Sequence, residues 1–362
     1  MLNARAAVRT MPSYHPPLSD REGLRLDFNE NTVGCSPRVL ECLRQLNAEQ
    51  LARYPERQSR EKIVAEFLGV ARSETLLTNG VDEAIHLLCE TYLEPEDEAL
   101  IVVPTFSMYK IYAAATGARV IEIPAGNDFQ FPSQDVLGCI TARTRLIAVA
   151  NPNNPTGSLA PQEDLLRIAR SAPHAAVLID EAYFEFSGQT LLEYWREVPN
   201  LFVARTFSKA YGLAGLRIGV LLGDAEQIRS VRRVSSPYNL NGVALACLPD
   251  ALADQDYVRQ YVSEVCAGRE RLQNTLRSAG IPFWPSHANF VLARFGLPRF
   301  AQSMRQRGIL VRDRSSDHGC EGCVRITLGP PAHTDRLLAA LQETLHELGV
   351  AQGQRQRQGV SR

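Results

Sequence analysis

The stretch Arg205–Gly219 reads RTFSKAYGLAGLRIG, and the interpretation of the whole chain begins there. The apolar run at 201–204 just before it is typical of a buried strand. Lys209 is the only lysine after Lys110, in a chain that otherwise prefers arginine. Proteins use an amine rather than a guanidinium where the group must lose its proton or form a Schiff base.

The neighbours of Lys209 favour a functional lysine over an ordinary exposed one. Thr206, Ser208 and Arg217 supply two hydroxyls and a cation, which are phosphate ligands. The nearby small residues, which let the backbone approach a ligand closely, are Ala210, Gly212, Ala214 and Gly215. An isolated Ser-Lys pair would indicate none of this.

The bulk composition is that of a soluble globular protein. The chain has 362 residues, of which 45% are hydrophobic and 22% charged, enough for one large core and a second smaller one. The net charge of -1 gives no electrostatic reason to expect nucleic acid or an anionic membrane as a partner. We find no apolar run near 18 residues and no signal-peptide core, so we expect a cytoplasmic protein.

The eight cysteines are scattered, which is typical of reduced thiols in a cytosolic enzyme. Cys320 and Cys323 form one C-x-x-C pair without a second pair or a histidine at finger spacing. We therefore expect a turn before a strand there rather than zinc, and no metal site elsewhere.

From about residue 76, short apolar runs alternate with helical stretches. This pattern predicts a mostly parallel central sheet with helices on both faces, in which ligands bind at the carboxyl ends of the strands. The expected strands are 98–103, 119–123, 145–150, 175–180, 201–205 and 218–222, and the expected helices are 81–93, 106–116 and 161–171. An earlier helix is expected to follow Ser36-Pro37, an N-cap with proline at N1, and to end near 46.

After about residue 241 the pattern becomes that of a smaller α+β C-terminal domain. We expect helices at 241–252, 254–279, 298–307 and from 334, with strands at 289–293, 308–311 and 324–328. The predicted organisation is an irregular N-terminal arm (1–28), a large domain (29–246), a small domain (247–350) and a disordered tail (351–362).

Polar motifs follow several of the predicted strands. Asn79-Gly80-Val81-Asp82 opens a helix, whose free N–H groups can bind an anion. Asn154 lies in the loop NPNNPTG at 151–157, which is rich in Asn and Pro and therefore rigid.

Asp180 ends a wholly apolar strand, where a buried acid must be paired, and a protonated ring nitrogen would pair it. The rival interpretation, a magnesium carboxylate of a nucleotide-hydrolysing protein, lacks its G-x-x-x-x-G-K-[ST] loop.

Two further features suggest contacts with a flat and an anionic group. Tyr109 begins a predicted helix, and its ring could stack on a flat conjugated ring. Arg325 alternates with Thr327 on one face of a predicted strand, and with Arg312 it could clamp an anion.

The segment S-K-A-x-G-L-A-G-L-R-I-G and the loop N-P-N-N-P-T-G resemble the corresponding motifs of fold-type I pyridoxal-phosphate (PLP) aminotransferases. The resemblance covers about 14–348 and is strongest to the histidinol-phosphate aminotransferase family. It implies a fold-type I PLP-transferase and PLP as cofactor, bound as an imine by Lys209.

The resemblance also assigns roles to the other motif residues. It implies that Asp180 pairs with the pyridinium, that Asn154 and Tyr183 meet the phenolate oxygen, and that Tyr109 stacks on the ring. The phosphate positions it implies are Val81, Asp82, Thr206, Ser208 and Arg217. Arg312, Arg325, Tyr14 and Asn154 match substrate-binding positions. Tyr54, in Arg53-Tyr54-Pro55, matches a residue that reaches the partner's cofactor, which implies a homodimer with shared active sites.

The resemblance implies transamination between histidinol phosphate and 2-oxoglutarate, in histidine biosynthesis. Thr32 and Cys35 stand where proline is common in the family, near the substrate entrance, so these departures from the family concern the substrate rather than the chemistry. The alternatives are an aromatic amino-acid aminotransferase, a threonine-phosphate decarboxylase of the same fold, and a cofactor-free binding protein that kept the fold.

Overall fold

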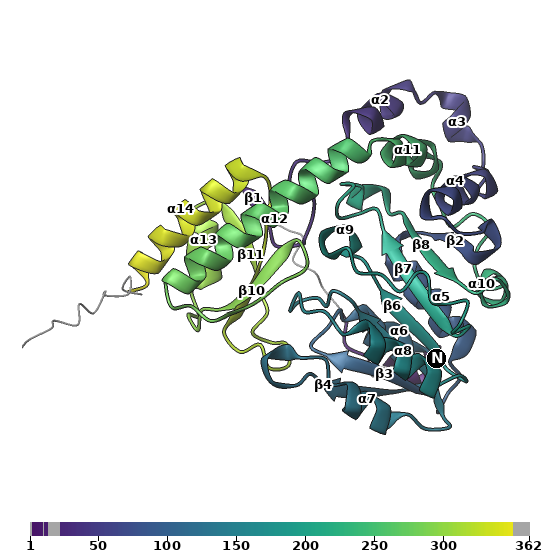
Figure 1. Cartoon of the computed structure of the whole chain (residues 1–362). Helices are drawn as coiled ribbons and strands as arrows, with labels where there is room; N and C mark the ends of the chain where they lie inside the picture. The colour runs from purple at the N-terminus through teal and green to yellow at the C-terminus, as the bar shows by residue number, and fades with distance from the viewer. Residues whose placement is uncertain (1, 10, 14–21, 350–362) are drawn as a thin grey trace, which may run out of the picture.

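A seven-stranded sheet forms the larger part of the molecule (Figure 1). The computed structural model describes residues 2–9, 11–13 and 22–349. The strands, in spatial order, are β2 (Thr75–Thr78), β8 (Gly219–Gly223), β7 (Leu201–Thr206), β6 (Ala176–Asp180), β5 (Thr144–Ala150), β3 (Glu98–Val103) and β4 (Arg119–Pro124). All neighbours from β7 to β4 are parallel, and only β8 runs antiparallel to β7 and β2. The predicted mostly parallel sheet is confirmed.

Helices cover both faces of this sheet, which explains why its strands are apolar throughout. Along β6, Val177 and Ile179 pack into one core and Leu178 packs into the other. The second core contains side chains from α5 (Gly80–Tyr92), α6 (Met108–Thr116) and α10 (Ala225–Arg232). The first contains side chains from α4 (Gln58–Leu68), α7 (Ser133–Cys139), α8 (Gln162–Ser171), α9 (Phe184–Ser187) and α11 (Gly242–Ala253).

A second, five-stranded sheet lies at the C-terminal end of the chain. Its spatial order is β1 (Leu24–Leu26), β11 (Ile309–Asp313), β12 (Cys323–Thr327), β10 (Phe290–Arg294) and β9 (Phe283–Trp284). The helices of this part are α12 (Gln255–Ser278), α13 (Phe300–Gln306) and α14 (Pro331–Glu347). In Figure 1 the long helix α12 runs from the region of α11 to this smaller part.

The prediction that residues up to about 26 are irregular is wrong. Ala6–Arg9 form the short helix α1, and Leu24–Leu26 form β1, which pairs in parallel with β11. Three residues carry too little pattern to indicate a strand, and this one is stabilised by a partner from the far end of the chain. Tyr14 and the tail 351–362 lie outside the described residues.

Most other elements agree with the sequence within a few residues. The helix after Ser36 is α2 (Pro37–Gln45), and the Ser36 side chain accepts a hydrogen bond from the Arg38 N–H. Besides α1, five of the described helices were not predicted: α3 (Ala48–Ala52), α4, α7, α9 and α10. The 24 residues of α12 do not make it a membrane span, because no described helix is both long and apolar enough to cross a bilayer.

Candidate active site

One cavity of about 540 Å³ collects nearly all the residues that the sequence suggested. It lies where β5, β6 and β7 end and the second sheet approaches. The predicted residues that line it are Val81, Asp82, Tyr109, Asn154, Asp180, Tyr183, Thr206, Ser208, Lys209, Arg217, Arg312 and Arg325. Residues from both sheets therefore share one site.

Lys209 lies in this cavity, just beyond the end of β7. Its Nζ donates a hydrogen bond of 3.3 Å to the Phe28 carbonyl oxygen. Burial lowers the pKa of Lys209 to about 8, and the positive charge of Arg325 acts in the same direction. A substantial fraction of this amine is therefore neutral near physiological pH, as a nucleophile or proton acceptor must be.

Asp180 is the buried acid at the end of β6. Its Oδ2 accepts a 2.5 Å hydrogen bond from the Tyr109 hydroxyl, and its Oδ1 accepts one of 3.0 Å from the Ala182 N–H. Burial raises the pKa of Asp180 to about 6, although both hydrogen bonds oppose the shift. The carboxylate lacks a cationic partner among the described hydrogen bonds and ion pairs, so a cationic ligand group would relieve a real electrostatic cost.

Asn154 and Arg325 connect the two sheets inside the cavity. Arg325 Nη1 donates to Asn154 Oδ1 at 2.5 Å, and Nη2 donates to the Asp27 carbonyl oxygen at 2.6 Å. Because the Asn154 oxygen is used in this way, its amide nitrogen is the group that can donate to a ligand. The Arg325 Nε is buried and has no partner within the described residues.

The opposite end of the cavity has the properties of a phosphate site. Arg217 pairs with Asp82 at 2.9 Å, beside the first turn of α5. The Ser208 hydroxyl is buried and unpartnered in the described part of the chain, although a buried hydroxyl normally finds a hydrogen-bond partner. A Cβ on Gly219 would lie only 2.9 Å from the Gly80 backbone carbon, so β8 and the start of α5 are in close contact here.

Two further residues of the site were not identified from the sequence. Arg314 lines the cavity beside Arg312 and pairs with Asp317, and its buried Nε lacks a partner among the described residues. Arg312 and Arg325 are paired residues on the neighbouring strands β11 and β12. The guanidiniums of Arg312, Arg314 and Arg325 therefore form an arginine-rich part of the cavity lining. The sequence signal was available: Arg314 comes two residues after Arg312, so continuing the alternation of β11 one residue past its end puts both on the same side.

Asn29 is the second residue that was missed. Its Nδ2 donates to the Tyr183 hydroxyl at 2.9 Å, and its Oδ1 accepts from Thr327 Oγ1 at 3.0 Å. Asn29, three residues after the end of β1, therefore fixes Tyr183 to Thr327 of the smaller sheet. Its φ of +56° is a conformation that asparagine tolerates better than most residues.

Among the predicted residues that the structure describes, Tyr54 does not line this cavity. Tyr54 is 79% exposed and lies against Tyr238, with ring centroids 4.4 Å apart and the ring planes tilted by 32°. Tyr14 lies outside the described residues. Cys320 and Cys323 are buried as free thiols on either side of the turn at 321–322, and Cys323 is the first residue of β12. No group of three or more potential metal ligands occurs within 2–9, 11–13 and 22–349.

Residues 21–341 match the family of class I and II aminotransferases. The chain belongs to this family. A histidinol-phosphate aminotransferase from Geobacillus sp. (strain WCH70) is 35% identical, covering 96% of this chain and 99% of the relative. Histidinol-phosphate aminotransferase 2 from Pseudomonas fluorescens is 37% identical, with 89% of each protein covered.

Solved structures of aminotransferases confirm the fold-type I prediction. The histidinol-phosphate aminotransferase from Sinorhizobium meliloti, crystallised with pyridoxal 5'-phosphate, superposes with a TM-score of 0.87 at 26% identity. The superposition covers 96% of this chain and 99% of the other. The aminotransferase fold thus extends over both sheets.

Proposed function

We propose that this aminotransferase transfers an amino group between histidinol phosphate and 2-oxoglutarate, with PLP as cofactor, as a cytoplasmic enzyme of histidine biosynthesis. The observation that carries the proposal is the cavity itself, whose lining combines a lysine with a lowered pKa, a phosphate-type site and three arginines. The curated relatives are named for the same activity.

The residues at one end of the cavity fit the PLP phosphate. The unpartnered Ser208 hydroxyl and the Arg217 guanidinium would bind it together with Thr206. The N–H groups of Val81 and Asp82, in the first turn of α5, would bind its remaining oxygens through the helix dipole. The Arg217–Asp82 ion pair would orient the guanidinium.

Other residues of the cavity fit the ring of the cofactor. Asp180 would bind the protonated ring nitrogen, and the Tyr109 ring would lie against the flat face. The Asn154 amide and the Tyr183 hydroxyl would meet the phenolate oxygen. When bound, PLP supplies an electron sink for the carbon that loses its proton during amino transfer.

Lys209 would act first as the residue that holds the cofactor and then as the proton carrier. Its lowered pKa leaves a neutral amine able to accept the proton from the substrate Cα. The same Nζ would return that proton to the cofactor carbon. General acid–base catalysis of this kind contributes roughly 10²–10⁴ in rate.

The arginine end of the cavity would bind the anionic end of each substrate. Histidinol phosphate has its phosphate where an amino acid has its α-carboxylate, so Arg325 and Arg312 can serve both half-reactions. Arg325 is buried, and it presents one unpartnered Nε among the described contacts. Tyr14 would complete the substrate site from the N-terminal segment.

We also propose a homodimer with shared sites, in which Tyr54 reaches the partner's cofactor. Its high exposure supports this role, because the side chain is accessible to a second subunit. The two sheets support the proposed large domain at 29–246 and small domain at 247–350.

A ranking of amino donors by kcat/KM, with 2-oxoglutarate as acceptor, tests the proposed function. Histidinol phosphate should rank first. Arg312→Ala should lower its kcat/KM by roughly thirtyfold or more, because truncating one side of a desolvated charge pair costs about 2–5 kcal/mol. Phenylalanine or tyrosine in first place would instead indicate an aromatic aminotransferase, and release of carbon dioxide from threonine phosphate would indicate a decarboxylase.

A further inference from the structure

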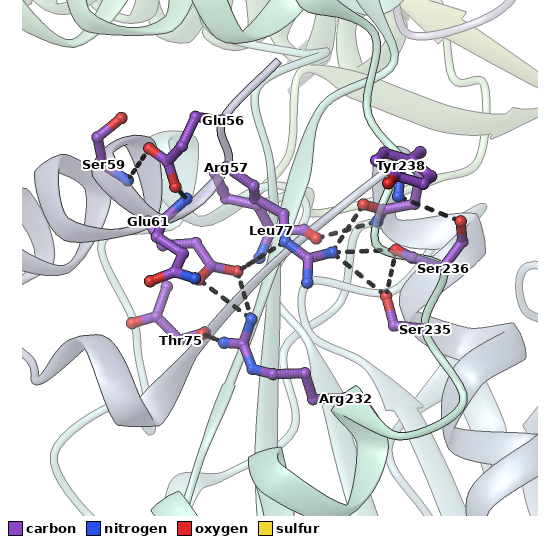
Figure 2. A network of polar contacts seen from close by, with 12 residues as sticks. Glu56, Arg57, Ser59, Glu61, Thr75, Leu77, Arg232, Ser235, Ser236 and Tyr238 are labelled. Atoms are coloured by element: carbon purple, nitrogen blue, oxygen red, sulfur yellow. Dashed lines mark hydrogen bonds and ion pairs between the residues drawn. The ribbon is translucent and has the colours of Figure 1, made fainter. Parts of the chain in front are cut away.

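A carboxylate outside the cavity organises the backbone that leads into the phosphate site. Glu61, on α4, is completely buried. Both of its oxygens accept hydrogen bonds from Arg232 Nη1, at 2.9 and 3.1 Å, and its Oε1 lies 3.3 Å from Arg57 Nε (Figure 2). A buried charge of this kind requires paired cations, and two are present.

The cluster of Glu61, Arg57 and Arg232 provides hydrogen-bond partners for backbone groups at the open edge of β2. As the outermost strand of the large sheet, β2 has a row of backbone groups without a strand partner. Glu61 accepts from the Leu77 N–H at 3.4 Å, and Arg232 Nη2 donates to the Thr75 carbonyl at 2.6 Å (Figure 2). Side chains therefore fix the strand that runs directly into α5.

A chain of hydrogen bonds continues from the cluster to the first turn of α5. Arg57 Nη1 donates to Asn239 Oδ1 at 2.8 Å, and Asn239 Nδ2 donates to Glu83 Oε2 at 2.7 Å. The same Glu83 oxygen accepts from the N–H of Asn79, the N-cap residue of α5, at 2.5 Å. This series of hydrogen bonds thus ends at Asn79, two residues before Val81, which lines the cavity.

The start of α5 has little freedom to adjust independently. Asn239 Nδ2 also donates to the Leu77 carbonyl at 3.2 Å, so strand and helix are held by one side chain. Gly80 has a φ of +72°, and Gly219 packs against its backbone. Helix N–H groups stabilise an anion only when they point at it, within a tolerance of about 0.5 Å.

We propose that Glu61, Arg57, Asn239 and Glu83 position the N–H groups of α5 that bind the cofactor phosphate. None of the four lines the cavity, so they act through the backbone at Asn79 rather than by touching the ligand. The proposal rests on the proposed function only in taking PLP as the ligand. Arg57 also follows Tyr54 closely in the chain, so the segment that carries this tyrosine is fixed by the same contacts.

The test compares two ligands that differ only in the phosphate. Apo protein is titrated with PLP and with pyridoxal, and the dissociation constants are measured for the wild type and for Asn239→Ala. The variant should bind PLP about tenfold more weakly, and pyridoxal less than twofold more weakly, because only PLP uses the N–H groups of α5. Equal weakening of both ligands would show a general structural role and overturn the proposal, as would unchanged binding of both.

Two further variants sharpen the experiment. Glu83→Ala, at a half-buried position, removes the carboxylate that accepts the hydrogen bond from the Asn79 N–H. It should weaken PLP binding more than pyridoxal binding, even if Asn239→Ala folds poorly. Lys62→Ala, on the same helix as Glu61, breaks only an exposed pair with Glu66 and should leave both constants unchanged. Wild-type protein that binds PLP but prefers another amino donor would contradict the proposed substrate while leaving this test intact.

Discussion

Replacing Asp180 with asparagine should stabilise the apo protein while weakening its hold on the cofactor. Burial raises the pKa of Asp180 from its ordinary 3.8 to about 6, so the folded state favours the protonated carboxyl. The stabilisation that this group provides is present below pH 3.8 and is lost as the pH rises through about 6. At pH 8 the ionised form costs about 3 kcal/mol, at about 1.36 kcal/mol for each pKa unit.

Asparagine resembles the neutral carboxyl, and the Tyr109 hydroxyl can accept a hydrogen bond from the new amide as readily as it now donates. Urea unfolding of the apo protein should therefore show Asp180→Asn to be more stable by about 3 kcal/mol at pH 8, and by about half of that at pH 5. Asp256→Asn is the control, since that side chain is 94% exposed and its change should alter neither value. Lower stability at pH 8, or a gain that does not vary with pH, would refute the reasoning. The affinity for PLP should fall in the same variant.

Three other predictions concern Lys209 and Tyr54. Lys209→Ala should abolish transamination but leave a folded protein that holds PLP noncovalently. Borohydride reduction of the wild-type enzyme with bound PLP should label Lys209. A label on Lys62 or Lys110 instead would contradict the role of Lys209. The rate at which an amine-selective reagent modifies Lys209 in the apo enzyme should increase with pH, with a midpoint near pH 8. Arg325→Met should move that midpoint to higher pH, because a neighbouring positive charge is lost. A midpoint at lower pH would be inconsistent with the site. In mixed dimers of Tyr54→Phe and Lys209→Ala subunits, the site that retains Lys209 should contain an intact Tyr54 from its partner. That site should therefore be more active than a site of the Tyr54→Phe parent. Activity equal to that of the Tyr54→Phe parent would show that the tyrosine serves its own subunit.

The parts of the site that the sequence predicted are those encoded within short segments. Asp180 could be identified because a carboxylate at the end of an apolar strand has few structural uses. Lys209 could be identified because hydroxyls and small residues surround it in sequence. The gathering of these segments follows from the parallel sheet, which brings the ends of β5, β6 and β7 to one edge.

What the sequence did not predict depends on pairs of residues far apart in the chain. Nothing near Glu61 indicates that Arg232 will neutralise it, and the helix α4 that carries it mixes charged and apolar residues without a clear stripe. Asn29 likewise has a function only because Tyr183, at the start of α9, and Thr327, on β12, both contact it. Such contacts are properties of the tertiary structure, so a local pattern does not contain them.

The pairing of β1 with β11 has a consequence for the order in which the enzyme can be made. Leu24 leaves the ribosome near the beginning of synthesis, and its partner Ile309 follows only when most of the chain has been completed. At about 5–20 residues per second, that interval is on the order of tens of seconds. The large sheet has all its strands once β8 is complete at Gly223, while the segment that ends at Asn29 still lacks the sheet that will hold it. The active site, which needs Asn29 against Tyr183, can therefore be completed only after the last third of the protein has been synthesised.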